Sequence, residues 1–203
     1  DQMLFYLPLS GSTFKKVYYD DLLGRAVSKF VPAEDLVVPY SATSLEDAEA
    51  VIHVLRISQN DLRKQQINGF YRDIDLGEPP LQQDQLKQKE LELEGIQQNG
   101  TEDMYTVLEM HVNLDLDGYE DVNPEDDEPT GIKLPYIVTL DEANAKVLSI
   151  RRNYEAGDVL KTKKDYFVHF KFLPGLGFYG LGLIHMIGGL SRTATVALRQ
   201  LLD

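Results

Sequence analysis

The fold of this chain depends on one glycine-rich stretch, Phe172-Leu-Pro-Gly-Leu-Gly-Phe-Tyr-Gly-Leu-Gly-Leu-Ile-His-Met-Ile-Gly-Gly-Leu190. It contains six glycines and no Asp, Glu, Lys or Arg, and it lies between a strand-like run and a predicted helix. The residues Gly175, Gly177 and Gly180 match the G-x-G-x-x-G fingerprint of dinucleotide-binding proteins. Alternatively, the glycines permit tight turns and close backbone packing.

The dinucleotide interpretation requires a parallel βαβ unit and an acidic residue roughly twenty positions after the fingerprint. Here the preceding strand belongs to a predicted antiparallel meander, Pro174 interrupts the turn, and the bulky Phe178-Tyr179 pair fills it. Asp203 has about the right separation but lies on the same predicted helix. The pattern therefore favours glycines chosen for packing, with an oxidoreductase as a remote alternative.

A helix is predicted from about Leu181 to the end of the chain, with one apolar stripe. Its members recur at spacings of three and four: Leu183, Ile187, Leu190, Ala194, Leu198 and Leu201. The stripe could pack against a neighbouring subunit, but we expect it to cover the chain's own sheet. Because the chain starts at Asp1 and ends within this pattern, we also expect it to be a piece of a longer protein.

Strands are predicted on both sides of an acidic loop, residues 118–131. Apolar residues alternate with polar ones from Leu108 to Asp117, which predicts one buried and one wet face, with His111 on the wet one. Residues 132–140, 147–154 and 165–172 read as three further strands joined by short turns, which makes a meander. At the N-terminus, residues 3–9 and 13–19 are expected to form a hairpin.

Two capping signatures predict helix starts, one at Thr43-Ser-Leu-Glu-Asp47 and one at Ser58-Gln-Asn-Asp61, with Gly69 ending the second helix. The β-branched run Val51–Ile57 between them favours a strand. Residues 82–98 are expected to form an exposed helix or an excursion from the fold. The fold class is therefore α+β, an antiparallel or mixed sheet with packed helices, in a single domain over residues 1–203.

Composition excludes several kinds of site. The absence of cysteine rules out disulfides, thiolate metal sites and a cysteine nucleophile. The net charge of -13 is concentrated between Thr101 and Gly131, which holds eleven acidic residues and no Lys or Arg. No run of basic residues predicts DNA binding, since Lys161-Thr-Lys163-Lys164 is short enough to be a surface turn. The apolar run Leu173–Leu190 could span a bilayer by length, but its glycines, Pro174 and His185 argue against insertion.

No residue is predicted to be catalytic, to bind a cofactor or to ligate a metal. The acidic sequence Asp115-Leu-Asp117-Gly suggests calcium, but its spacing fits no known calcium loop, so a solvated loop is favoured and a calcium-binding module stays an alternative. The four histidines stand far apart and show no metal-ligand spacing: His53, His111, His169 and His185.

Several segments, in order along the chain, resemble the P22-like portal proteins of tailed bacteriophages. These segments are Gly11–Asp20, Ala33–Tyr40, Ser58–Arg63, Gly69–Tyr71, Lys133–Val138, Val147–Tyr154 and Phe167–Asp203. The least similar parts are residues 76–100 and the acidic loop 118–131.

The resemblance implies a structural virion protein without enzymatic activity. Portal proteins form a dodecameric ring at one capsid vertex, where double-stranded DNA is packaged and ejected without sequence-specific binding. The resemblance further implies partners among capsid, terminase and head–tail connector proteins, a location in the virion and, during assembly, in the host cytoplasm, and no membrane association. The matched region corresponds to the outer, wing-like part of the portal subunit.

Overall fold

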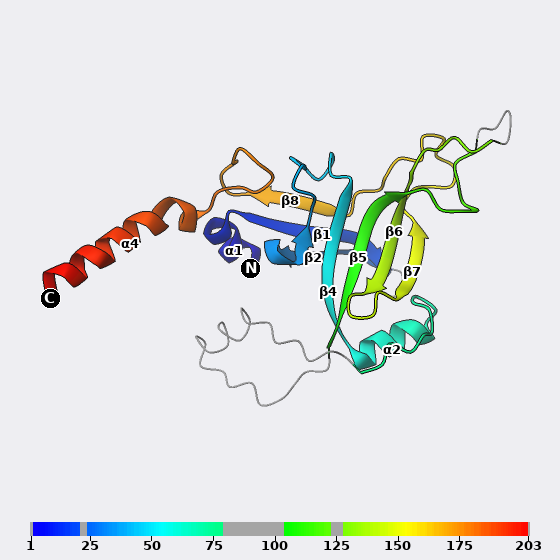
Figure 1. Cartoon of the computed structure of the whole chain (residues 1–203), viewed down its shortest axis with the longest axis horizontal. Coiled ribbons are helices and arrows are strands. Elements are labelled where there is room, and N and C mark those ends of the chain that lie inside the picture. The colour runs from blue at the N-terminus through cyan, green and yellow to red at the C-terminus, as the bar shows by residue number, and fades with distance from the viewer. Residues whose placement is uncertain (1, 21–23, 79–103, 123–127, 203) are drawn as a thin grey trace. The chain divides into compact units, whose positions relative to one another are not determined.

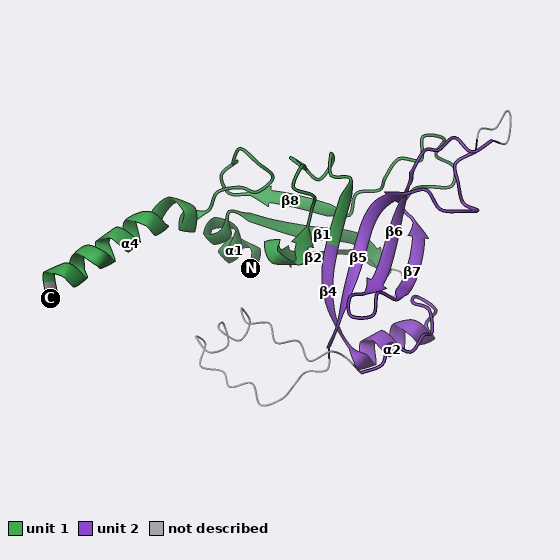
Figure 2. Ribbon diagram, viewed as in Figure 1, with its two compact units in different colours: residues 1–52, 154–203 green, residues 53–153 purple. Residues whose placement is uncertain are grey.

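The computed structural model describes residues 2–20, 24–78, 104–122 and 128–202, and it has an α+β fold with two antiparallel sheets (Figure 1). The chain divides into two compact units, where the sequence predicts one domain. Unit 1 contains residues 1–52 and 154–203, and unit 2 contains residues 53–153 (Figure 2).

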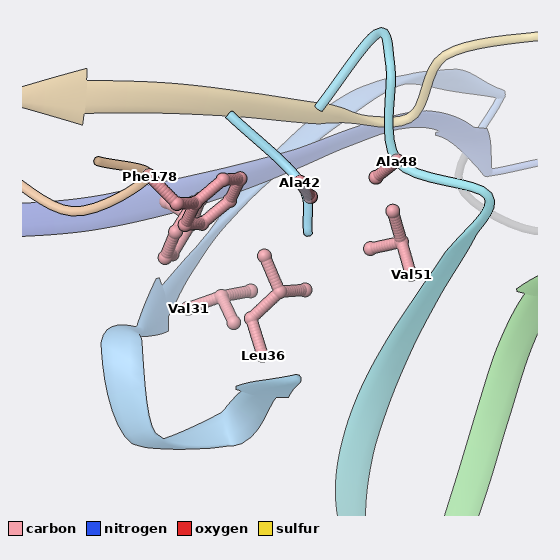
Figure 3. Close-up of a cluster of buried hydrophobic side chains, with 7 residues drawn as sticks. Val31, Leu36, Ala42, Ala48, Val51 and Phe178 are labelled. Carbon is pink, nitrogen blue, oxygen red and sulfur yellow. The ribbon is translucent and has the colours of Figure 1, made fainter. Parts of the chain in front are cut away.

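Unit 1 is built around a three-stranded sheet with the order β2-β1-β8. The strands are β1 (Ser12–Asp20), β2 (Arg25–Pro32) and β8 (Phe167–Lys171). β1 is central and antiparallel to both neighbours. A hydrophobic core lies against this sheet and contains Phe14, Val31, Leu36, Ala42, Ala48, Val51 and Phe178 (Figure 3).

The predicted N-terminal hairpin is half wrong, because residues 3–9 form part of helix α1 (Gln2–Ser10) and only the second strand exists, as β1. Both edges of β1 are occupied by β2 and β8, so no place remains for a strand from residues 3–9. The helix instead packs on the sheet, where Tyr6 contacts Phe30 with ring centroids 5.6 Å apart. An unbroken apolar run carries no periodicity that separates helix from strand.

The second sheet has the order β3-β4-β5-β6-β7. Its strands are β3 (Leu36–Val37), β4 (Ala50–Ser58), β5 (Met104–Leu114), β6 (Leu134–Asp141) and β7 (Val147–Arg152). A short 3-10 helix, η1 (Ala33–Asp35), precedes β3. The strand predicted at residues 51–57 is confirmed as β4, whose residues from His53 onward belong to unit 2. The core of unit 2 contains Leu62, Tyr71, Leu76, Tyr105, Val107 and Leu148.

Of the two predicted helix starts, one is confirmed. Helix α2 (Gln59–Ile67) begins after Ser58, whose side chain accepts a hydrogen bond from the Asp61 amide, and Gly69 follows with φ +72°. Residues 43–47 form only a turn, in which the Asp47 carboxylate accepts hydrogen bonds from Thr43 and Ser44. The Thr43 hydroxyl and the Ser44 amide thereby lower the pKa of Asp47 to about 2. The helix does not propagate because the β-branched run that follows pairs as β4.

The predicted meander of three strands is correct for β6 and β7 and wrong for its last strand. β6 pairs with β5 and with β7, whereas β8 pairs with β1 in unit 1. The outer side of β7 already faces the segment after α2, since the Arg72 amide donates to the Leu148 carbonyl at 2.8 Å. β8 therefore completes the other sheet, where β1 has a free edge of matching length. The expected excursion at residues 82–98 lies outside the described residues.

Strand β5 also differs from the prediction in which face is buried. Its most buried residues include Tyr105, Val107 and His111, on the face expected to be wet, while Leu108 and Met110 are half-buried. His111 is tolerated inside because its Nε2 lies 2.8 Å from the Glu109 carboxylate. A polar pair that satisfies itself can occupy a core position, so strict alternation misassigned the faces.

Helix α4 (Leu183–Leu202) is confirmed at the end of the chain. Among the residues that the structure describes, none of the helices combines the length and the apolar composition needed to cross a bilayer.

Candidate functional site

The glycine loop, defined here as residues 172–182, connects β8 to α4 and folds back against the start of β1. Leu173 and Leu181 pair across the loop, with backbone hydrogen bonds of 2.7 and 3.3 Å. The Phe172 amide donates to the Gly11 carbonyl at 3.0 Å, which ties the loop to the end of α1. The loop is therefore a packed part of unit 1.

The amide groups at the end of this loop are already used within the chain. Gly180 donates to Ser12 Oγ at 2.7 Å, Leu181 donates to the Leu173 carbonyl, and Gly182 donates to His185 Nδ1 at 3.1 Å. A dinucleotide site needs such amides free to bind a pyrophosphate at the helix N-terminus, after a strand in a parallel unit. Here β8 is antiparallel to β1, so the local geometry does not reproduce that site.

Three glycines allow α1, β1 and the loop to approach closely. A Cβ on Gly180 would lie 2.5 Å from the Gly11 carbonyl oxygen, and one on Gly182 would lie 2.4 Å from the Leu9 carbonyl oxygen. Gly11 has φ +88°, a conformation that favours glycine. Gly177, the middle glycine of the fingerprint, has open space around it. Close packing therefore explains why glycine occupies positions 11, 180 and 182. It does not explain Gly177, the middle glycine of the fingerprint.

Ser12 and His169 hold the loop from the sheet side. The buried Ser12 hydroxyl accepts from Gly180 and lies 3.1 Å from His169 Nε2. The imidazole packs against two rings, with centroids 4.3 Å from Phe14 and 4.8 Å from Phe178. Desolvation, with a smaller contribution from the positive charge of Lys171, lowers the pKa of His169 to about 4. At neutral pH the imidazole is uncharged, so it can accept the Ser12 hydroxyl hydrogen.

Helix α4 leaves its apolar stripe exposed, which overturns the expectation that the stripe covers the chain's own sheet. Every residue from Leu183 to Leu201 is exposed, and α4 contacts the rest of unit 1 mainly at α1 (Figure 1). Leu190 is 72 % exposed and Leu201 is 82 % exposed. The charged residues of the helix are Arg192 and Arg199, with no acidic residue. Among the described residues nothing packs on the apolar stripe of α4, and an exposed apolar stripe of this length is typical of a protein-interaction surface.

The remaining histidines serve structural contacts. His53 is buried in β4, and His185 accepts the Gly182 amide at the start of α4. His111, expected on a polar strand face, is buried, and the half-buried His169 packs against Phe14. In the described part of the chain, no three His, Asp or Glu side chains gather in a way that could hold a metal ion.

The described residues of the acidic loop are exposed apart from Glu120 and Asp121, which are half-buried. Asp115 and Asp117 follow the end of β5 with exposed side chains. The two ends of the acidic loop meet, since Val122 pairs with Pro129 and the Thr130 amide donates to the Asp121 carbonyl at 2.8 Å. The basic turn behaves as a surface element, in which Lys164 Nζ lies 3.0 Å from the Glu155 carboxylate.

Unit 2 has an open groove of about 410 Å³ between the segment Gly69–Arg72 and strand β7. Arg151 crosses it, with its guanidinium carbon 3.7 Å from the Phe70 ring centroid and Nη2 donating to the Phe70 carbonyl at 2.9 Å. Burial, reinforced by the charge of Glu109, raises the pKa of Tyr71 to about 12, so this hydroxyl stays protonated. The groove walls are thus held together by the arginine, and nothing in this geometry resembles an activated nucleophile.

One feature that no sequence motif indicated is an excess of basic residues on the strands of the unit 1 sheet. The three strands hold five basic residues and one acidic residue, in a chain whose net charge is -13. Strand pairing places Lys16 directly opposite Lys29, whereas Lys15 points to the other face of the sheet. The sequence alone could have predicted this pairing only with the correct strand register.

A comparison with protein-family models finds no match for this chain, and a comparison with curated proteins finds none either.

Proposed function

We propose that this chain is part of a portal protein of a tailed bacteriophage, from the wing-like region outside the DNA channel. In this role it is a structural virion protein with no catalytic residue. Complete subunits would form a ring, expected to be dodecameric, that conducts double-stranded DNA during packaging and ejection. Capsid, terminase and head–tail connector proteins would be the partners of that ring.

The observation that carries this proposal is the exposed apolar stripe of α4. Burial of a leucine side chain contributes about 2 kcal/mol, so a stripe of six apolar positions represents roughly 10 kcal/mol of unused stabilisation. The basic character of α4 suits contact with an otherwise acidic chain, since its two arginines face no acidic residue on the helix. A subunit of a closed ring needs such a surface, whereas a monomeric enzyme does not.

The positions of the portal-like segments also support the proposal. The segments Gly11–Asp20 and Phe167–Asp203 lie at opposite ends of the chain, yet β1 and β8 pair directly and Ser12 contacts His169 across 157 residues. These two portal-like segments therefore meet in unit 1, where the glycine loop serves their packing. This is how a scaffold would use glycine-rich sequence.

The experiment is negative-stain electron microscopy and solution mass of the complete open reading frame that contains this chain. Rings with a central hole are expected. A double variant, Leu190→Asp with Leu198→Asp, should abolish the rings and leave the circular dichroism of the subunit unchanged. Thr195→Asp, which adds a charge to the same helix outside the stripe, should still form rings.

A monodisperse monomer under assembly conditions would contradict the proposal. Thermal unfolding with NAD(H) and with calcium then separates the alternatives, since a ligand that binds only the folded state raises the midpoint. A shift with NAD(H) would favour an oxidoreductase, and a shift with calcium that a chelator reverses would favour a calcium-binding module.

A further inference from the structure

Strand β7 forms one edge of the five-stranded sheet, next to β6 (Figure 1). Along an antiparallel strand, the backbone groups of alternate residues turn to opposite sides. The Asn153 amide donates to the Pro135 carbonyl at 2.9 Å, so Arg151, two positions earlier, also bonds toward β6. The amides and carbonyls of Ile150 and Arg152 therefore point away from the sheet. Among the described residues they have no hydrogen-bond partner on that side.

The groove of unit 2 lies along this open side of β7, between the strand and the segment Gly69–Arg72. The Arg72 amide donates to the Leu148 carbonyl, and among the described residues this is the one backbone hydrogen bond between segment and strand. Phe70 is 46 % exposed and Ile150 is 49 % exposed, so the groove presents apolar side chains. An open strand edge beside exposed apolar side chains is a surface to which extended peptides add as a further strand.

Three arginines lie on or beside this edge, and none of them forms an ion pair with a described residue. They are Arg72, Arg151 and Arg152, all exposed in a chain whose net charge is -13. Arg151 uses Nη2 for the Phe70 carbonyl, but a guanidinium has further N–H donors. Successive side chains of a strand point to opposite faces, so Arg151 and Arg152 flank the edge on both faces. This arrangement fits an extended chain with two consecutive acidic residues, one for each arginine.

A second copy of this chain is a poorer occupant of the edge. Pairing of two β7 strands would bring arginines close to arginines, and like charges on paired strands destabilise a sheet. Charged residues on an edge strand also protect a protein from such self-pairing. Protection alone explains the charges, whereas an acidic peptide also uses the groove and the unpaired amides.

We propose that the open edge of β7 binds an extended acidic peptide of a partner protein as an additional strand. The backbone groups of Ile150 and Arg152 exchange hydrogen bonds with the peptide backbone. The guanidinium groups of Arg151 and Arg152 pair with two consecutive carboxylates, and an apolar side chain of the peptide packs on Phe70. The site uses unit 2 alone and does not involve α4. It is therefore independent of the proposed portal function.

The test is fluorescence anisotropy of a labelled peptide, Thr-Val-Glu-Glu-Val-Thr, titrated with the chain at low salt. The same peptide with two lysines in place of the glutamates should bind at least roughly tenfold more weakly, because two attractions become repulsions. A peptide methylated on the backbone nitrogens of both glutamates should bind about fivefold more weakly. Consecutive residues turn their amides to opposite sides, so one of the two methyl groups always removes a donor to β7.

Arg152→Glu should weaken binding of the glutamate peptide roughly tenfold, because an attraction becomes a repulsion. Arg192→Glu is the matched control, the same substitution at an exposed arginine of α4 in unit 1. It changes the net charge equally and should leave the affinity unchanged. Ile150→Pro removes an outward amide while the bonds between β7 and β6 remain, and should weaken binding about fivefold. Circular dichroism of each variant verifies that the fold is intact.

The proposal is overturned if the glutamate peptide does not bind, since the arginines would then only protect the edge. It is also overturned if Arg152→Glu and Arg192→Glu behave alike, or if the methylated peptide binds as well as the unmodified one. The methylated peptide tests the backbone bonds even if Ile150→Pro fails to fold. Self-association of the chain that Ile150→Pro abolishes would show that the edge pairs with a second copy, and would contradict the proposal as well.

Discussion

Replacing Gly180 by alanine tests whether the glycine loop is a packing element. The added Cβ would lie 2.5 Å from the Gly11 carbonyl oxygen, 2.8 Å from the Leu173 carbonyl oxygen and 3.1 Å from Lys171 Cβ. The two nearest atoms belong to the backbone and cannot rotate away, so the loop must move off β1. That movement would stretch the hydrogen bond from Gly180 to Ser12. Overpacking of this kind costs about 1–3 kcal/mol, and a weakened buried hydrogen bond adds about 1 kcal/mol.

Urea unfolding is the assay, followed by circular dichroism and by the fluorescence of the eleven tyrosines, since the chain has no tryptophan. We expect Gly180→Ala to lower the free energy of unfolding by about 3 kcal/mol. The matched control is Gly177→Ala in the same loop, where an added Cβ meets nothing within 4 Å. That variant should be neutral, or more stable by about 0.5 kcal/mol because alanine restricts the unfolded chain.

The two variants also distinguish the packing interpretation from the dinucleotide interpretation, because each predicts a different important glycine. In a dinucleotide fingerprint the second glycine admits the pyrophosphate, so Gly177 would be important for binding and its replacement would abolish any response to NAD(H). The packing argument would be refuted if Gly180→Ala unfolded at the wild-type urea concentration. It would also be refuted if Gly177→Ala were the more destabilised of the two.

Three further outcomes can be measured on the same chain. Ser12→Ala removes the partner of the Gly180 amide and of His169 Nε2, and should cost about 1–3 kcal/mol in urea unfolding. Because the pKa of His169 is lowered to about 4 in the folded state, its contribution to stability is complete above pH 6.5 and is lost as the pH falls toward 4. Thermal midpoints measured between pH 7 and pH 4 should therefore fall less in His169→Phe than in the wild type. Ser58→Ala deletes the N-cap of α2 and should lower the free energy of unfolding by about 1 kcal/mol. Ser44 lies in a turn with no helix after it, so Ser44→Ala should leave the helix content measured by circular dichroism unchanged.

Local signals in the sequence predicted those elements whose causes are local. The serine cap and the closing glycine located α2, and spacings of three and four located α4. The turn at residues 141–145 located the β6–β7 hairpin, since one short loop determines that pairing. The α+β class followed from these elements.

The errors have non-local causes. The strand-like residues 3–9 became a helix because β2 and β8 occupy both edges of β1, which no local pattern reveals. The capping signature at Thr43 was satisfied within a turn because the next residues pair as β4. His111 was placed in solvent because its partner Glu109 neutralises the cost of burial only in the folded strand.

The surface features also divide into those with local causes and those with non-local causes. The apolar stripe of α4 was visible from residue spacing, but its exposure depends on what the sheet of unit 1 can cover. The pairing of Lys16 with Lys29 could not be predicted, because the two residues are thirteen positions apart and become neighbours only through strand register. Charge counted along the chain indicated the acidic loop and did not reveal that the strands of the unit 1 sheet are rich in basic residues.

Unit 1 is assembled from both ends of the chain, and this has a consequence for folding during synthesis. Its central strand β1 is made early, but His169 of β8 and Gly180 of the glycine loop follow Ser12 by 157 and 168 residues. Unit 2, continuous from residue 53 to residue 153, can complete its core while β1 still waits with one edge unpaired. Closing such a distant contact is slow. During translation that exposed edge is the place where premature pairing with another nascent chain would begin.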